Sequence, residues 1–139
     1  MKKMLLITGI LTLLLLLPTI SSQTNESTTI EIININGGVG GVTVDVKNTG
    51  ENIATDIWVI TTVTGGTLNN ININHECTGC SACGSTLDPG LIKSENTREA
   101  GILVGFGPIE ISTSAGASNA ETVSMEQTGF VFGPIAIIQ

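Results

Sequence analysis

Beyond residue 29, apolar and polar side chains alternate with a period of two residues, and no segment shows apolar residues at helical spacing. This period is typical of a β-strand with one face in a core. The clearest case is segment 41–47, which has valines at positions 42, 44 and 46 and polar residues at positions 43, 45 and 47. Clusters of Gly, Pro and Asn separate such segments. The pattern predicts an all-β protein.

The spacing of turn signals predicts seven to nine short strands in two packed antiparallel sheets, an immunoglobulin-like β-sandwich. We expect strands at residues 30–36, 41–47, 54–63, 68–74, 95–104, 121–125 and 130–138, with a further strand starting near Pro108. Both faces of segment 54–63 are partly apolar, which predicts a central strand whose outer side is covered. Trp58 lies in that strand, and we expect it to have a structural role.

Two short segments of the chain nearly repeat each other. The sequence FGPIEI at 106–111 matches FGPIAI at 132–137 in five of six positions. Because proline is confined to strand starts, edges and bulges, we expect two strands that enter the core through the same kind of kink. Segment 130–139 is too apolar to remain unpaired, so we expect it to close its own sandwich; donation to a neighbouring chain is the alternative.

The first residues have the three parts of a secretory signal peptide. Lys2 and Lys3 precede an apolar run at 4–17, and a break with small residues follows at 18–22. We therefore predict a signal peptide at 1–22, a short flexible segment at 23–29 and one domain at 30–139; retention of the first segment as an uncleaved anchor is the alternative. Asn25 begins a glycosylation sequon. These features predict a secreted or cell-surface protein.

Charge and composition narrow the classes of partner and activity. Without Lys2 and Lys3, three basic residues remain against twelve acidic ones, a net charge of 3 − 12 = −9. Nucleic acid and anionic lipid are poor partners for such a surface, and contact with a membrane is expected only through the N-terminal segment if it is retained. The chain has one histidine, no tyrosine and no Gly-x-Ser-x-Gly elbow. We therefore expect no enzymatic activity.

All three cysteines and the only histidine lie in the segment HECTGCSACG, residues 75–84. His75, Cys77, Cys80 and Cys83 are ligand types of a tetrahedral zinc site, but four ligands this close would require one loop to wrap the ion. A redox pair would need nearby cations, and none is close in sequence. We expect a disulfide that staples the loop, either Cys77 with Cys83 or Cys80 with a neighbour, and no cofactor. Zinc binding stays as the alternative.

Two longer segments resemble a known family. The sequence VTVDVKNTGENIATDIWV, residues 42–59, resembles the strand-turn-strand signature of CARDB-type immunoglobulin-like domains of prokaryotic exported proteins. Segment 105–138 is similar to the closing strands of small archaeal domains of that sort. The resemblance rests on structural positions such as the turn residues Asn48 and Gly50. It implies a sandwich fold and a surface location, and it carries over no catalytic residues.

These observations favour a non-enzymatic exported module for cell-surface architecture or adhesion. Its partners would be other surface proteins or copies of itself. Two alternatives remain from the sequence: a subunit of an extracellular filament, joined by strand addition or an intermolecular disulfide, and a metal-binding protein that uses His75, Cys77, Cys80 and Cys83.

Three cysteines in an oxidising compartment leave one without a partner inside the chain. We predict that the purified exported protein contains either one reactive thiol per chain or a dimer that separates on reduction. Thiol titration under denaturing conditions and non-reducing electrophoresis measure both. Three reactive thiols together with stoichiometric zinc would contradict the staple and favour the metal site.

Overall fold

The computed structural model describes residues 26–78 and 84–139, which form an all-β structure. Its strands are β1 (Ile30–Gly37), β2 (Val42–Asn48), β3 (Ala54–Thr55), β4 (Trp58–Gly65), β5 (Ile71–Thr78), β6 (Thr86–Leu87), β7 (Ile92–Asn96), β8 (Gly105–Ala117), β9 (Ala120–Gly133) and β10 (Ile135–Ile138). Two short 3₁₀ turns, η1 (Thr67–Asn69) and η2 (Thr97–Glu99), complete the elements. None of the helical turns in these residues is long and apolar enough to cross a membrane.

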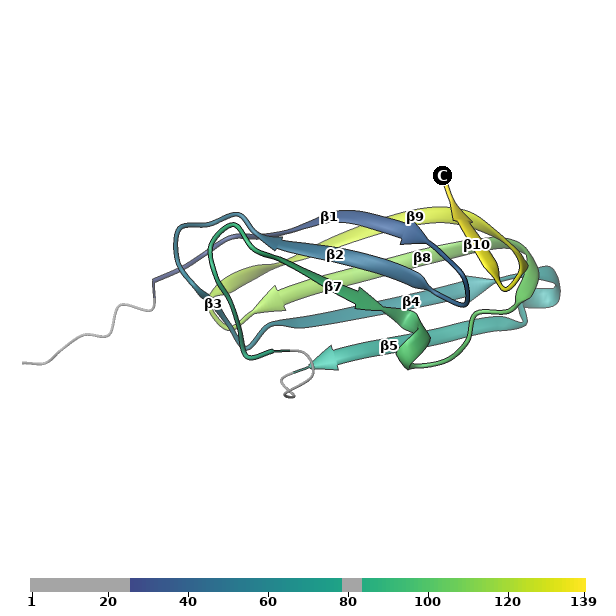
Figure 1. Ribbon diagram of the computed structural model, residues 1–139, viewed down its shortest axis with the longest axis horizontal. Coiled ribbons are helices and arrows are strands. Elements are labelled where there is room, and N and C mark those ends of the chain that lie inside the picture. The colour runs from purple at the N-terminus through teal and green to yellow at the C-terminus, as the bar shows by residue number, and fades with distance from the viewer. Residues whose placement is uncertain (1–25, 79–83) are drawn as a thin grey trace, which may run out of the picture.

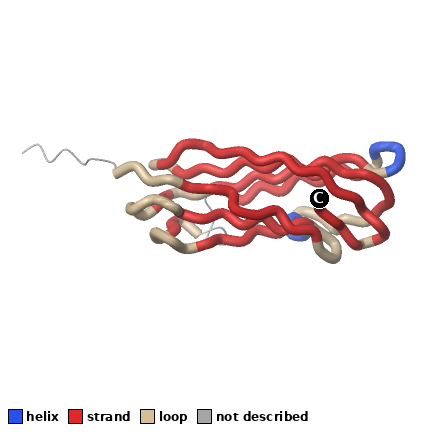
Figure 2. Tube along the Cα trace, turned by 90° about the horizontal axis from the view of Figure 1, so that it is seen from above, coloured by secondary structure: helices blue, strands red, loops and turns tan. Residues whose placement is uncertain are grey.

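The strands form two main antiparallel sheets that face each other (Figure 1). One sheet has the order β1-β2-β7 and the other the order β10-β9-β8-β4-β5, while β3 and β6 form a separate small pair. Seen from above in Figure 2, the long strands run along the length of the molecule. The two orders correspond to strands A-B-E and G-F-C-C′ of immunoglobulin-like sandwiches, with β10 added beyond G. The predicted all-β sandwich is confirmed.

The core lies between the inner faces of the two sheets. Val42, Val44 and Val46 of β2 are fully buried, as the alternating pattern predicted. The opposing sheet contributes buried residues from β4 and β8, including Val63 and Ile111. The side chains that fill this core are mostly β-branched, and no aromatic residue is among the largest fully buried ones in the described chain.

The predicted long strand at 54–63 is wrong, because the chain changes sheets within it. Asp56 adopts a left-handed backbone conformation, with φ of 50°. The break separates β3, which pairs with β6, from β4, which lies at the inside of the five-stranded sheet. Trp58 begins β4 and is opposite Gly116 of β8, where a side chain would collide with the indole ring. Trp58 therefore packs against the bare backbone of its neighbouring strand.

Two other strand boundaries differ from the prediction. The strand expected at 68–74 begins at Ile71 and continues to Thr78, because Leu68 takes a positive φ in η1 and is almost fully exposed. The strand expected at 95–104 covers residues 92–96 instead. It ends where the Asn96 side chain accepts a hydrogen bond from the backbone N–H of Arg98 and caps η2.

The two near-repeats meet at one end of the sandwich, with Phe106 of β8 directly opposite Phe132 of β9. The expected common kink is wrong: Gly107 lies within β8, whereas Gly133 lies at the turn from β9 into β10. Residues 120–133 form one strand rather than the two predicted. The C-terminal β10 pairs with β9 of its own chain, which agrees with closure of its own sandwich.

Asn48 fixes the end of β2 through a complete set of hydrogen bonds. Its side chain is fully buried. The Oδ1 atom accepts from Thr28 Oγ1 at 2.9 Å and from the Gly50 N–H at 3.0 Å. The Nδ2 group donates to the carbonyls of Asn52 and Leu87, each at 2.8 Å. Since an amide side chain has two donors and two acceptor sites, this group is satisfied, and it ties three other segments to β2.

We predict that Asn48→Ala lowers the free energy of unfolding by about 2 to 4 kcal/mol, because buried partners would lose their hydrogen bonds. Urea denaturation measures this loss as a lower midpoint, while the slope of the unfolding free energy against urea concentration stays unchanged. Asn72→Ala is the matched control: Asn72 is exposed on β5, so the change should stay within about 0.5 kcal/mol. Equal losses in the two variants would contradict a special role for Asn48.

Candidate functional site

The segment rich in cysteine and histidine begins on a strand and not in a loop. His75 and Cys77 belong to β5, and both side chains are buried, at 5% and 3% exposure. The alternating Glu76 and Thr78 point outward. Cys80 and Cys83 lie outside the described residues, as do Asn25 and the predicted signal peptide. The structure therefore places two of the four predicted metal ligands, both on the inner face of an edge strand.

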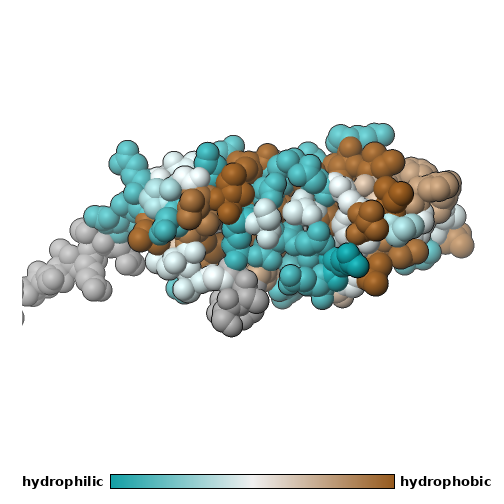
Figure 3. Space-filling view, viewed as in Figure 1, coloured by the Kyte–Doolittle hydropathy of each residue, from teal (hydrophilic) through white to brown (hydrophobic). Residues whose placement is uncertain are grey.

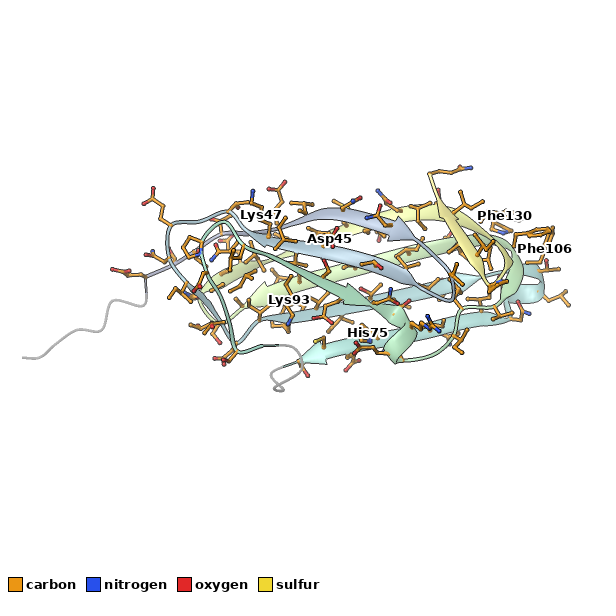
Figure 4. All side chains as sticks on the ribbon, viewed as in Figure 1. Asp45, Lys47, His75, Lys93, Phe106 and Phe130 are labelled. Atoms are coloured by element: carbon orange, nitrogen blue, oxygen red, sulfur yellow. The ribbon has the colours of Figure 1, made fainter. Side chains whose placement is uncertain are left out.

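His75 lies where the edges of the two main sheets come together. Strand β5 is the edge of the five-stranded sheet, and β7 is the edge of the three-stranded sheet. His75 Nε2 is 3.7 Å from Glu95 Oε2 of β7. Figure 4 shows His75 and Lys93 on these two neighbouring strands. We call this place the edge seam, lined by His75, Lys93, Glu95 and Glu99.

Glu95 is an acidic residue on the inner face of its strand and is only 7% exposed. Its two oxygen atoms have different neighbours. Oε1 is 3.2 Å from Lys93 Nζ, whereas Oε2 faces His75. The lysine offsets part of the cost of burying this carboxylate, because a buried charge needs an ionic or hydrogen-bonding partner. Lys93 also holds one carboxylate oxygen and leaves the other directed at the imidazole.

His75 Nε2 has no hydrogen-bond partner among the described residues, although the atom is buried. At 3.7 Å, the Glu95 oxygen is beyond hydrogen-bond distance. Buried polar atoms normally have a partner, since an unsatisfied one costs about 1 to 3 kcal/mol. The imidazole is therefore held at the edge seam with one nitrogen directed at carboxylates and not bonded to them.

A third acidic group approaches from η2. One ligand atom each from His75, Glu95 and Glu99 lies within 4.8 Å of the others. Glu99 is exposed, whereas the turn that carries it is anchored. Thr97 is 1% exposed, and its hydroxyl accepts the backbone N–H of Val42 at 2.9 Å. The fold thus brings one imidazole and two carboxylates to the same place.

Sequence reasoning missed Glu95 and Glu99, which it took only as charges at the start of a strand. The available signal was the pairing pattern: Glu95 alternates with Ser94 and Asn96 and is opposite the fully buried Val44 of β2. A charged residue in such a register position faces inward. Identifying that position requires knowledge of which strand neighbours β2, which the chain order does not supply.

A second feature is an apolar surface at the end of the sandwich opposite Glu26. Phe106 and Phe132 contact each other edge to face, with ring centroids 5.7 Å apart, and Phe132 is opposite Ile135. Ile135 in turn bridges to Val39. We call this surface the apolar end patch; its exposed residues are Val39, Ile102, Val104, Phe106, Phe132, Ile135 and Ile137. Figure 3 shows hydrophobic residues gathered at that end.

No protein-family model matches the chain, and no curated protein matches it.

Proposed function

We propose that this chain is an exported, non-enzymatic immunoglobulin-like module, of the CARDB type, that acts at the cell surface in architecture or adhesion. The sandwich strand order and the sequence resemblance at 42–59 support the type of domain. The basic and apolar N-terminal segment supports export. The absence of enzymatic activity is proposed from the sequence, which has one histidine and no tyrosine.

The apolar end patch carries the proposal of an adhesive or architectural role. Phe106 and Phe132 are 54% and 62% exposed, and Ile137 is 56% exposed, although each could have been buried in the core of a sandwich. Large contiguous apolar surfaces on soluble domains mark interaction sites. The acidic surface elsewhere limits non-specific contact. A partner protein with an apolar surface of its own would fit this end.

The position of the patch suits a module held at its N-terminal side. Glu26, the first described residue, lies at one end of the long axis, and β10 with the patch lies at the other (Figure 1). A chain attached or exported through its N-terminal segment would therefore present the patch away from the point of attachment. This geometry supports contact with a neighbouring surface protein.

We also propose that a disulfide from Cys77 staples the turn after β5. The buried position of Cys77 at the end of β5 supports a staple, and the other two cysteines, Cys80 and Cys83, lie outside the described residues. A cysteine in a disulfide cannot supply a thiolate to zinc. The metal-binding alternative with His75, Cys77, Cys80 and Cys83 as ligands is therefore the weaker one.

The filament alternative joins copies of this chain by strand addition or an intermolecular disulfide. Strand donation by the C-terminus has less support, because β10 already pairs with β9 and its Ala136 N–H donates to the Gly38 carbonyl at 2.9 Å. Self-association through the patch would bury Phe106 and Phe132 between copies.

We predict that labelled mature protein binds purified envelopes of the source cells, and that the double variant Phe106→Ser, Phe132→Ser loses at least about tenfold in affinity, because two exposed aromatic anchors are removed. Leu91→Ser is the matched control: Leu91 is 54% exposed and lies near Asn48, far from the patch. Sedimentation of envelopes with bound label measures the affinity.

Size measurements on the same proteins separate the two candidate functions. A monomer that binds envelopes through the patch supports the surface module. Concentration-dependent assemblies that the double serine variant abolishes support the filament subunit. Equal envelope binding by the wild type and the double variant would contradict an adhesive role of the patch.

A further inference from the structure

We propose that His75, Glu95 and Glu99 form a binding site for a divalent transition-metal ion, with Zn²⁺ the best fit, at the edge seam between β5 and β7. This site is separate from the apolar end patch and does not use the cysteines. It would join one ligand from the five-stranded sheet to two ligands from β7 and η2 on the other side.

The unsatisfied imidazole is the first observation behind this proposal. His75 is only 5% exposed, and its Nε2 is buried without a hydrogen bond among the described residues. A metal ion is one of the few partners that accepts the lone pair of a neutral imidazole and tolerates two nearby carboxylates. In the tautomer that carries its proton on Nδ1, Nε2 would otherwise present an acceptor to the acceptor oxygen of Glu95.

The separation of the ligand atoms is the second observation. Zinc binds histidine nitrogen and carboxylate oxygen at about 2.0 to 2.2 Å, so tetrahedral ligands lie about 3.4 Å from one another. His75 Nε2 and Glu95 Oε2 are already 3.7 Å apart. Glu99 is exposed, and one of its oxygen atoms lies within 4.8 Å of a ligand atom of His75 and of Glu95, so a small rotation of its side chain would bring it to the ion. Water would complete the coordination.

The surroundings of Glu95 favour binding through one oxygen. Lys93 Nζ lies 3.2 Å from Glu95 Oε1, and Glu95 Oε2 faces His75. Metal-bound carboxylates are commonly held in this way by a second group that orients them. Two carboxylates and one ammonium give the seam a net charge of −1 with a neutral imidazole, which a divalent cation converts to +1.

The choice of ion follows from the ligand types. Imidazole favours zinc, copper, nickel and iron, whereas calcium and magnesium prefer sites built from oxygen alone. One nitrogen and two oxygens therefore predict Zn²⁺ binding and weak Ca²⁺ or Mg²⁺ binding.

The test is titration calorimetry of the full mature protein with Zn²⁺, after iodoacetamide has blocked any accessible thiol under non-reducing conditions. We expect one Zn²⁺ per chain and a higher melting temperature with zinc, because the ion binds only the folded state. Glu99→Gln should weaken binding by about tenfold or more without affecting the fold, since Glu99 is exposed. His75→Gln should do the same, but it changes a buried position.

Glu76→Gln is the matched control, because Glu76 is adjacent to His75 in sequence and points outward from β5. Its zinc affinity should equal that of the wild type. X-ray absorption of the zinc-loaded protein should show only nitrogen and oxygen neighbours, at about 2.0 Å, and no sulfur at about 2.3 Å. The proposal is overturned if the blocked protein binds no zinc, if Glu99→Gln binds as tightly as Glu76→Gln, or if sulfur is found in the inner shell.

Discussion

The packing of two inner sheet faces against each other is the constraint on which the other features depend. It is built from valine and isoleucine at alternate positions, as in Val42, Val44 and Val46 of β2. Because a one-residue slip would turn these side chains to solvent, the core fixes the register of β2 against β1 and β7. The register then determines that Glu95 faces inward toward His75.

The same choice of aliphatic core residues leaves the three phenylalanines at one end of the molecule. The chain has three phenylalanines and one tryptophan. Trp58 covers the backbone of Gly116. Phe106 and Phe132 meet edge to face at the apolar end patch, where Phe106 also contacts Phe130 with ring centroids 5.2 Å apart. Residues that usually fill a core are therefore available at the surface, where they can serve recognition.

The sequence predicted those strands whose alternation is strict and whose ends carry turn residues, such as β2. The prediction failed where one apolar segment of the sequence contributes strands to two different sheets. Residues 54–63 read as one strand, whereas Asp56, with its positive φ, and Ile57 separate β3 from β4. Of the three residues of the candidate metal site, only His75 was identified from the sequence, by its residue type, whereas Glu95 and Glu99 required knowledge of which sheet edges meet. Such contacts between distant segments leave no local signal.

The scarcity of basic residues and their placement have a consequence for resistance to proteolysis. In residues 26–139 a protease of trypsin-like specificity could cut only after Lys47, Lys93 and Arg98. Lys47 lies on β2 and pairs with Glu31 on one side and Ile92 on the other. Because such enzymes require an extended, unpaired backbone, cleavage there needs the sheet to open first. The fold itself would thus shield the Lys47 site from digestion.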